Sequence, residues 1–254
     1  MKCLLIDNSK PGLCEFTRHL EILLADLVEV VCCHTTADVT KQINMNEFDA
    51  AILSGSSLNL SEPTRVDYTR KSITTLLRLN NIPILGICFG MQLISSMYGG
   101  TVKRLESMIK TEQNIHILSG NVLLGGQECN MKVTLSHQDY VHAVPNDFTC
   151  FCYHNGCAQL IESLKYLRFG VQFHPERKPH IEEKCVLQNF FKFVLERKRI
   201  EFLQLDDNTR IQIINMIGHK SIPFISQKFG IGVDTIMCLW RTHLQVWNLP
   251  AVLV

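Results

Sequence analysis

One cysteine of this sequence is placed where it could act as a nucleophile. Cys88 stands between Gly86 and Gly90, where an apolar segment ends and a helical pattern begins. Small residues on both sides permit a tight, strained turn that projects the thiol outward at a helix N-terminus, where the helix dipole favours a thiolate. Most cysteines are buried as small hydrophobic residues, but the flanking glycines favour a nucleophile here.

A thiolate nucleophile needs an imidazole to transfer its proton and a carboxylate to hold that imidazole in one tautomer. His174 and Glu176 supply both groups, directly after an apolar segment that ends at Phe173. A lone histidine is usually structural. Because this one accompanies a glycine-flanked cysteine, the sequence predicts a hydrolytic triad of Cys88, His174 and Glu176.

These two motifs resemble those of the class I glutamine amidotransferases. The nucleophile motif GxCxGxQ of that family is matched by Gly86, Cys88, Gly90 and Gln92, and its HPE motif is matched by residues 174–176. The resemblance implies that the chain hydrolyses glutamine to glutamate and ammonia without a cofactor. It also implies a separate synthetase that takes up the ammonia.

A third segment narrows the resemblance. Ser136-His137-Gln138-Asp139 is similar to the SHxD segment in the amidotransferase domain of GMP synthetase, so GMP synthesis is the expected use of the ammonia. The resemblance implies that backbone groups around Gln138 and Asp139, with the side chain of Gln92, hold the amino-acid end of glutamine. His137 itself is expected to be an ordinary loop histidine.

The tetrahedral intermediate of amide hydrolysis requires N–H groups that converge on its negative oxygen. The family's loop for this purpose reads GG or GGP, and it matches Ser54-Gly55-Ser56, which follows an apolar segment. The resemblance implies an oxyanion hole at Gly55 and Ser56, with the amides of Ser56 and Phe89 as donors. Because a side chain restricts positive φ, we expect the Ser56 loop to rest in another backbone state before glutamine binds, and the activity to be weak or conditional.

The elements that position these residues begin with four short apolar segments. They are separated by stretches of 15 to 30 residues with helical periodicity, which predicts a parallel sheet covered on both faces. Ligand sites should then follow Asp7, Leu53 and Ile87, at the carboxyl ends of the strands. The resemblance implies a flavodoxin-like three-layer α/β domain. The segments are residues 4–6, 28–32, 50–53 and 82–87.

The second half of the predicted domain has a different pattern. From Thr101 onward, short alternating segments predict β structure that extends the same sheet. An apolar helix over about 181–195 is expected to be the last element of the domain. The charged residues 196–199 are expected to end it and to separate the domain from the unit that follows. The amidotransferase domain is therefore placed at 1–197.

Residues 200–254 are expected to form a small all-α unit. Helices are predicted from Asp207 to Ile217, from Ser221, and over 232–243. The spacing of a small residue, a turn glycine and an apolar residue resembles a helix-turn-helix. Because residues 199–254 carry five Lys or Arg against four Asp or Glu, a protein-interaction or dimer-forming unit is favoured over a nucleic-acid contact.

Composition excludes several other classes of protein. The net charge of +1 indicates no large basic field for nucleic acid or membranes, and no segment reaches 18 apolar residues. The eleven cysteines are scattered along the chain and their number is odd, which favours reduced thiols in a cytoplasmic protein. Residues 150–157 contain cysteines and a histidine, but the second CxxC of a structural zinc site is missing, so no metal is expected.

Two other functions fit the same sequence features. A free-standing γ-glutamyl hydrolase would use the same triad on peptides or conjugates, with no acceptor for ammonia. A non-enzymatic regulator would use the fold to sense a metabolite and the helices of 200–254 to bind DNA or protein. Substrate profiling would distinguish the γ-glutamyl hydrolase from the amidotransferase. DNA binding that survives loss of Cys88 would identify the regulator.

Overall fold

The computed structural model describes residues 1–10, 16–35, 44, 47–62, 79, 81–177, 181–203, 205–217, 219–231 and 236 of the chain. The chain divides into two units, Met1–Phe191 and Lys192–Val254. Throughout these described ranges, no helix is both long and apolar enough to cross a membrane.

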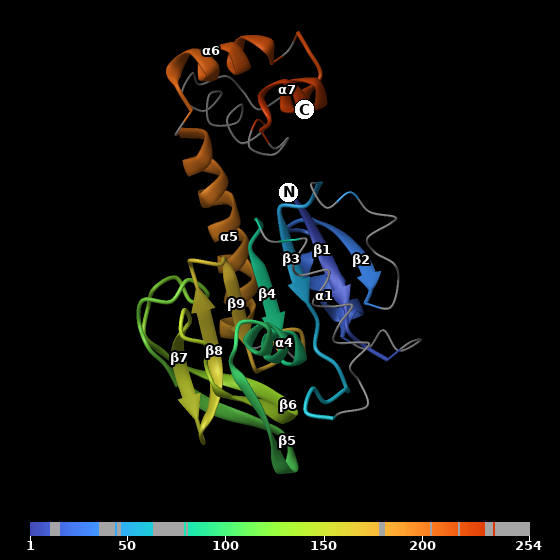
Figure 1. The fold of residues 1–254 in the computed structure, drawn as a ribbon, viewed down its shortest axis with the longest axis vertical. Coiled ribbons are helices and arrows are strands. Elements are labelled where there is room, and N and C mark those ends of the chain that lie inside the picture. Colours follow the sequence, from blue (N-terminus) through green and yellow to red (C-terminus); the bar gives the residue numbers. More distant parts are fainter. Residues whose placement is uncertain are drawn as a thin grey trace. The chain divides into compact units, whose positions relative to one another are not determined.

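Within the described part of Met1–Phe191, seven strands form one sheet in the order β2-β1-β3-β4-β9-β8-β7 (Figure 1). The first five strands in this order run parallel, whereas β8 is antiparallel to β9 and β7 is antiparallel to β8. The predicted parallel sheet is thus confirmed. The strands are β1 (Lys2–Asp7), β2 (Glu29–His34), β3 (Ala50–Leu53), β4 (Ile84–Ile87), β7 (Thr149–His154), β8 (Cys157–Ser163) and β9 (Arg168–Val171).

Helices cover both faces of the middle of this sheet. Side chains of consecutive strand residues point to opposite faces. On β9, the ring of Phe169 packs against Phe190 of α5 (Ile181–Leu203), with ring centroids 5.7 Å apart, whereas a Cβ added at the next residue, Gly170, would lie 2.7 Å from Met91 Cγ of α4 (Phe89–Met97). These two helices therefore lie on opposite faces, and this is why β3, β4 and β9 are buried along their full length.

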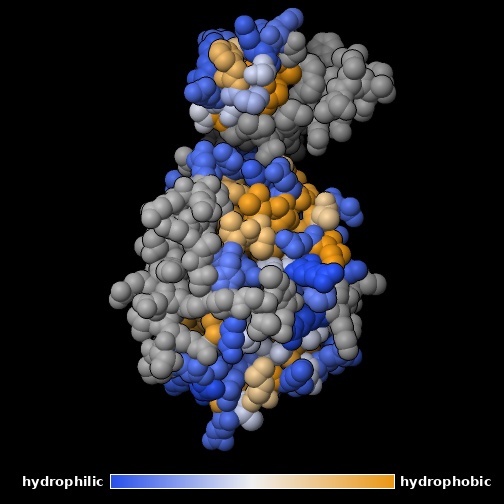
Figure 2. All heavy atoms as spheres, turned by 90° about the vertical axis from the view of Figure 1, so that its right-hand side faces the viewer, coloured by the Kyte–Doolittle hydropathy of each residue, from blue (hydrophilic) through white to orange (hydrophobic). Residues whose placement is uncertain are grey.

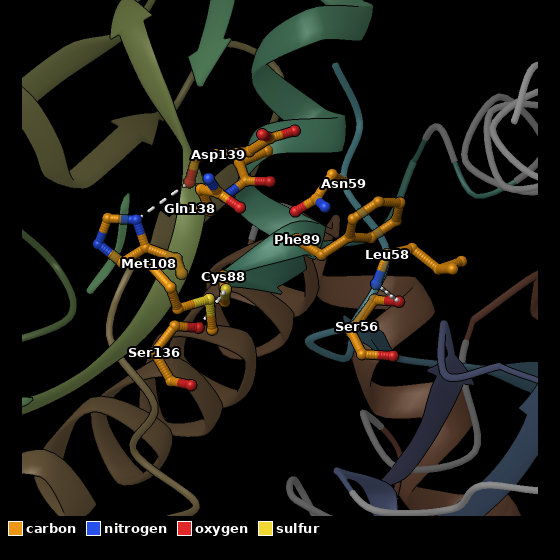
Figure 3. A pocket seen from close by; sticks show the side chains of 12 residues that line it. Ser56, Leu58, Asn59, Cys88, Phe89, Met108, Ser136, Gln138 and Asp139 are labelled. Atoms are coloured by element: carbon orange, nitrogen blue, oxygen red, sulfur yellow. Dashed lines mark hydrogen bonds between the residues drawn. The ribbon is translucent and has the colours of Figure 1, made fainter. Parts of the chain in front are cut away.

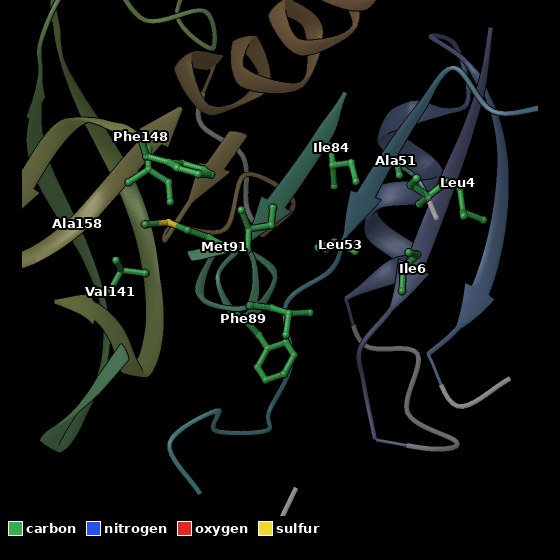
Figure 4. Packing of buried hydrophobic residues seen from close by; sticks show 14 of the residues in the cluster. Leu4, Ile6, Ala51, Leu53, Ile84, Phe89, Met91, Val141, Phe148 and Ala158 are labelled. Atoms are coloured by element: carbon green, nitrogen blue, oxygen red, sulfur yellow. The ribbon is translucent and has the colours of Figure 1, made fainter. Parts of the chain in front are cut away.

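The core beside α4 joins distant parts of the unit. Figure 4 shows Met91 and Phe89 of α4 between side chains of β1 and β3 on one side, such as Leu53, and Val141 and Phe148 on the other. All five are less than a tenth exposed. Helix α4 is held from both directions, so its first residues, which adjoin Cys88, have a fixed position.

The strands after Thr101 were all expected to extend the main sheet, but only some of them do so. The long strands β5 (Thr101–Ile117) and β6 (Cys129–Ala143) pair antiparallel in a two-stranded sheet of their own, and only β7, β8 and β9 join the main sheet. Alternating polarity predicts a strand but does not identify its partner. Residues 136–139 lie inside β6.

The charged residues 196–199 do not end the helix that precedes them, contrary to the prediction. They lie within α5, which continues to Leu203, because Glu, Arg and Lys are good helix formers and no Gly or Pro interrupts the run. The boundary between the two structural units falls at Phe191 and Lys192, inside the same helix. The division into domains at 197–200 stays a prediction.

The unit Lys192–Val254 contains α6 (Asp207–Met216) and α7 (Ile222–Phe229). The Asp206 carboxylate accepts hydrogen bonds from the amide and hydroxyl of Thr209 in the first turn of α6, and Gly230 ends α7 in the left-handed conformation with φ 66°. Both predicted helices are therefore present. The predicted third helix at 232–243 lies outside the described residues except for Ile236, and the helix-turn-helix interpretation stays a prediction.

Ten large hydrophobic side chains are exposed among the described residues, and Ile22 and Met108 are two of them. Figure 2 shows one face, on which hydrophobic residues gather in a patch among hydrophilic ones. Exposed apolar atoms are ordinary on folded domains. The surface therefore assigns no partner by itself.

Candidate active site

The carboxyl ends of the parallel strands bring the predicted site residues together. After β1, the amide of Asn8 donates to Ser54 Oγ at 2.9 Å, and the Ser56 hydroxyl donates to the Asn8 carbonyl at 2.7 Å. After β4, the amide of Cys88 donates to the carbonyl of Val171 in β9 at 2.7 Å. The loops after Asp7, Leu53 and Ile87 thus meet at one edge of the sheet, as predicted.

Cys88 occupies a strained turn between β4 and α4. Its φ of 51° and ψ of −103° lie in a region that L-residues rarely adopt. A Cβ added at Gly86 would lie 2.4 Å from the carbonyl carbon of Gly90, and one added at Gly90 would lie 2.4 Å from the Leu53 oxygen. Both glycines are therefore required by close backbone approach, which is the geometry expected of a nucleophile elbow.

His174 is held by contacts on several sides. Its Nδ1 lies 2.6 Å from Glu176 Oε1, and both side chains are buried. Burial disfavours the imidazolium, but Coulombic attraction from Glu176 and Cys88, with hydrogen bonds to both, raises the pKa of His174 to about 10. The ring also stacks on Phe16, with centroids 5.6 Å apart. The arrangement fixes the imidazole beside the cysteine.

The Cys88 sulfur has two further polar neighbours. Gln172 Nε2 donates to Sγ at 3.4 Å, and the Ser136 carbonyl lies 3.8 Å from Sγ and 3.4 Å from His174 Nε2. Gln172 and Phe16 were not predicted as site residues. Phe16 has no sequence signal that separates it from a core phenylalanine, whereas Gln172 is a polar residue inside an otherwise apolar strand segment, two residues before His174.

The predicted oxyanion-hole residues lie close to the nucleophile. Ser56 and Phe89 line the same cavity as Cys88, and within the described ranges neither backbone amide donates to another group. Gly55 packs against the His174 ring, where an added Cβ would lie 2.9 Å from Cε1. Ser56 is not among the residues with positive φ, and its hydroxyl accepts from the Leu58 amide at 3.0 Å. The serine therefore cross-links its own loop.

A cavity of about 130 Å³ opens above the sulfur. In Figure 3, Ser136, Gln138 and Asp139 of β6 lie on one side of it, and Ser56 and Leu58 lie on the other. The cavity thus combines the predicted nucleophile with all three residues predicted to bind glutamine. Its full lining is Ser56, Ser57, Leu58, Asn59, Cys88, Phe89, Gln92, Met108, Ser136, His137, Gln138 and Asp139.

The three residues predicted to bind glutamine are tied to their neighbours. Gln92 Nε2 donates to the Asp139 carbonyl at 2.7 Å. The Asp139 carboxylate accepts from the amide and hydroxyl of Ser61 at 2.7 and 2.8 Å, and Gln138 Oε1 accepts from Arg104 at 2.9 Å. Because the Gln138 and Asp139 side chains are occupied in these bonds, they shape the cavity wall by holding the backbone of β6.

His137 differs from the expectation of a loop histidine. It is buried within β6, its Nδ1 lies 3.1 Å from the Asp139 carbonyl, and its Nε2 has no hydrogen-bond partner among the described residues. Desolvation lowers its pKa to about 4, against the raising effect of the bond to Asp139. The ring is therefore neutral at pH 7, with Nδ1 protonated and Nε2 an acceptor.

The described segments contain no group of three or more His, Cys, Asp or Glu side chains placed to hold a metal ion. The buried acid-base groups around Cys88 instead fit nucleophilic chemistry on a small substrate. A thiol at a strained turn and a carboxylate-bound imidazole are groups that acyl transfer requires, and the amides of Ser56 and Phe89 belong to residues that line the same cavity.

Comparison with known proteins agrees with this geometry. The family model for glutamine amidotransferase class-I matches residues 6–194. The chain belongs to the class I glutamine amidotransferase family. Its 189 matched positions, counted from 6 to 194, include every residue of the candidate site.

Several relatives of this amidotransferase carry GMP synthase names. It is 36% identical over 130 residues to a glutamine-hydrolyzing GMP synthase subunit of Methanococcus maripaludis, covering 50% of this chain and 68% of the relative. It is 37% identical over 122 residues to the corresponding subunit of Methanobrevibacter smithii, covering 46% of this chain and 62% of that relative. The glutamine-hydrolyzing GMP synthase of Finegoldia magna is matched over only 31% of its length, at 36% identity and 62% of this chain.

Solved structures show the same fold for the amidotransferase. A Thermoplasma acidophilum protein assigned as one subunit of a GMP synthase superposes with a TM-score of 0.68 at 22% identity, covering 79% of this chain and 97% of the other. A Thermotoga maritima glutamine amidotransferase gives a TM-score of 0.58 at 19% identity, covering 79% and 86%. The flavodoxin-like α/β fold that the sequence predicted is confirmed.

Proposed function

We propose that this amidotransferase hydrolyses glutamine to glutamate and ammonia through Cys88, His174 and Glu176. The Cys88 thiolate attacks the side-chain amide carbon of glutamine, and the amides of Ser56 and Phe89 donate to the oxyanion. The imidazolium of His174 protonates the departing ammonia, so that a γ-glutamyl thioester remains on sulfur. Water activated by neutral His174 then attacks the thioester and releases glutamate and the thiol.

One observation carries this proposal: His174 is buried between the Glu176 carboxylate, 2.6 Å from its Nδ1, and the strained Cys88 at the floor of a cavity. A buried imidazole with both partners in place at pH 7 is arranged for proton transfer to and from a thiolate. The cavity above Cys88 leads the substrate to sulfur, while His174 itself stays shielded from water.

The direct test is covalent labelling by a glutamine analogue that carries an electrophile, such as 6-diazo-5-oxo-L-norleucine. Peptide mass mapping should place one adduct on Cys88, and excess glutamine should slow its formation, whereas glutamate should compete weakly. Labelling spread over several cysteines and unaffected by glutamine would contradict the proposal. Ammonia release from glutamine, followed in parallel, distinguishes turnover from binding.

We further propose that the ammonia serves a separate synthetase protein that forms GMP. The support is that the relatives from Methanococcus and Methanobrevibacter are named as glutamine-hydrolyzing subunits of GMP synthase. Mixing the chain with a GMP-forming synthetase that lacks its own amidotransferase should permit GMP formation from glutamine. If only free ammonium supports GMP formation in the mixture, the partner assignment fails, and a free-standing γ-glutamyl hydrolase becomes the better description.

Gly55→Ala is expected to lower the glutaminase kcat by about 100-fold, because small displacements of a catalytic group have effects of this size. The added Cβ would lie 2.9 Å from His174 Cε1 and 3.2 Å from the Phe16 ring, so the imidazole must shift. Gly126→Ala is the control for activity. Its added Cβ meets no atom within 4 Å, and its φ of 81° adds backbone strain to the protein without displacing His174. Equal kcat values for the two variants would show that the His174 ring tolerates displacement.

A further inference from the structure

Gln172 lies against the nucleophile but belongs to neither the triad nor the oxyanion hole. It follows Val171, the last residue of β9, and is fully buried. Its Nε2 donates to Cys88 Sγ at 3.4 Å, within the range of hydrogen bonds to sulfur. We propose that Gln172 is a further catalytic residue, whose side-chain amide stabilises the negative charge on the Cys88 sulfur. This inference rests on the proposed function.

The orientation of the Gln172 amide follows from its neighbours. The Asp139 carbonyl is only an acceptor, so the end of Gln92 that faces it, at 2.7 Å, must be the NH₂ group. The same NH₂ group donates to Gln172 Oε1 at 3.2 Å. The other end of Gln172, which faces Cys88 Sγ, must therefore be its own NH₂ group, and the donor points at sulfur.

The surroundings of the sulfur make this donor important. On one side, the Ser136 carbonyl lies 3.8 Å from Sγ and can only accept a hydrogen bond, so it favours the thiol over the thiolate. The sulfur is almost completely buried, and a buried charge is unfavourable unless it is paired and hydrogen-bonded. The His174 imidazolium supplies the pairing charge, and Gln172 supplies a neutral donor that stays in place when His174 gives up its proton.

That persistence places Gln172 in a defined step of the reaction. When water has added to the γ-glutamyl thioester, the C–S bond breaks and its electron pair returns to sulfur. His174 took up a proton from the water when the water added, and it can now give this proton to the leaving sulfur. The Gln172 N–H group already points at this sulfur, so the charge that develops there is stabilised without rearrangement.

The test measures thiolate formation without glutamine turnover. The rate of carbamidomethylation of Cys88 by iodoacetamide, read by peptide mass spectrometry across a pH series, reports the fraction of thiolate. Gln172→Met keeps the side-chain volume but removes the donor. We expect the pH of half-maximal labelling to rise by about one to two units, in line with the strength of hydrogen bonds to charged groups, and kcat for glutamine to fall about tenfold or more.

Gln159→Met is the matched control. Gln159 is a buried glutamine on the adjacent strand β8, and its carbonyl accepts from the Gln172 amide at 2.9 Å, while its Nε2 donates to the Cys157 carbonyl at 3.5 Å and not to Cys88. The variant therefore changes the packing beside Gln172 but leaves the donor to sulfur in place. Its labelling profile should match that of the unaltered protein. If Gln172→Met does not fold, as judged by circular dichroism, Gln172→Glu provides the second variant. This change keeps the acceptor for Gln92 but turns an oxygen toward sulfur, and it should raise the pH of half-maximal labelling further.

A labelling profile unchanged in the folded Gln172 variant, or shifted equally in Gln159→Met, would overturn the proposal. Failure of the proposed function has a different signature. In that case the pH profile of the Gln172 variant shifts as expected, but glutamine neither protects Cys88 nor releases ammonia. The labelling profile therefore tests the role of Gln172, and glutamine protection with ammonia release tests the proposed function, so that either can fail without the other.

Discussion

Cys88→Gly is expected to abolish glutamine hydrolysis, by roughly six orders of magnitude, and yet to give a more stable protein than Cys88→Ala. Activity is lost because removal of a triad nucleophile has effects of about this size. Stability differs because Cys88 has φ 51° and ψ −103°, a conformation that glycine adopts readily and alanine does not. Both variants lack the sulfur and its contacts, so their comparison isolates the backbone strain.

The difference in free energy of unfolding between the two variants should be about 1 kcal/mol in favour of glycine. Chemical denaturation with urea measures it directly, and ammonia release measures the activity of both. Equal stability of the glycine and alanine variants would mean that the turn at Cys88 relaxes at no cost, and the strained nucleophile elbow would have to be abandoned.

Glu176→Gln is expected to lower the glutaminase kcat by roughly 10³- to 10⁴-fold, with little change in the fold. The amide removes the charge that lies 2.6 Å from His174 Nδ1 and no longer favours the tautomer with a proton on Nδ1. Glu162→Gln is the matched control. Glu162 is also a buried carboxylate, but it accepts from the amides of Val122 and Leu123 and lies outside the site. Its substitution should leave kcat nearly unchanged.

The same Glu176 variant has a second readout in the dependence of stability on pH. His174 has a folded pKa raised from 6.5 to about 10, although burial acts against it, because Glu176 and Cys88 favour the imidazolium. Its contribution to stability is complete below about pH 6.5 and is lost as the pH rises through about 10. In Glu176→Gln the loss should begin at lower pH, so the difference in unfolding free energy between pH 6 and pH 10 should shrink. An unchanged difference would show that Glu176 does not set the charge of His174.

Much of the fold, and the places of Cys88, His174 and Glu176 in it, could be predicted because the signals are local. Cys88 with its two glycines and His174 with Glu176 are short motifs, each at the end of an apolar strand. The strands at residues 50–53 and 84–87 are buried on both faces, so their uniform apolar character survives in the sequence. The places where these strands end, and where the candidate site residues lie, could therefore be predicted from the sequence.

What could not be predicted depends on contacts between distant residues. Nothing local distinguishes β6, which pairs only with β5 among the described strands, from β7, which joins the main sheet. The contact of Gln172 with Cys88 joins residues 84 positions apart. Likewise, His137 was expected to be a loop histidine, whereas it lies within β6, where buried and less buried side chains alternate, and its own side chain is buried.

The pairing of β9 with β4 also has a kinetic consequence. The proposed nucleophile is at the end of β4, and its proposed base follows β9, which is made much later in synthesis and must insert between β4 and β8. Long-range parallel pairing of this kind forms slowly, because the loop-closure entropy is lost before the contacts are gained. A nascent or partly folded chain therefore carries Cys88 without the imidazole beside it, and under the proposed mechanism the thiol becomes an active nucleophile only when the sheet is complete.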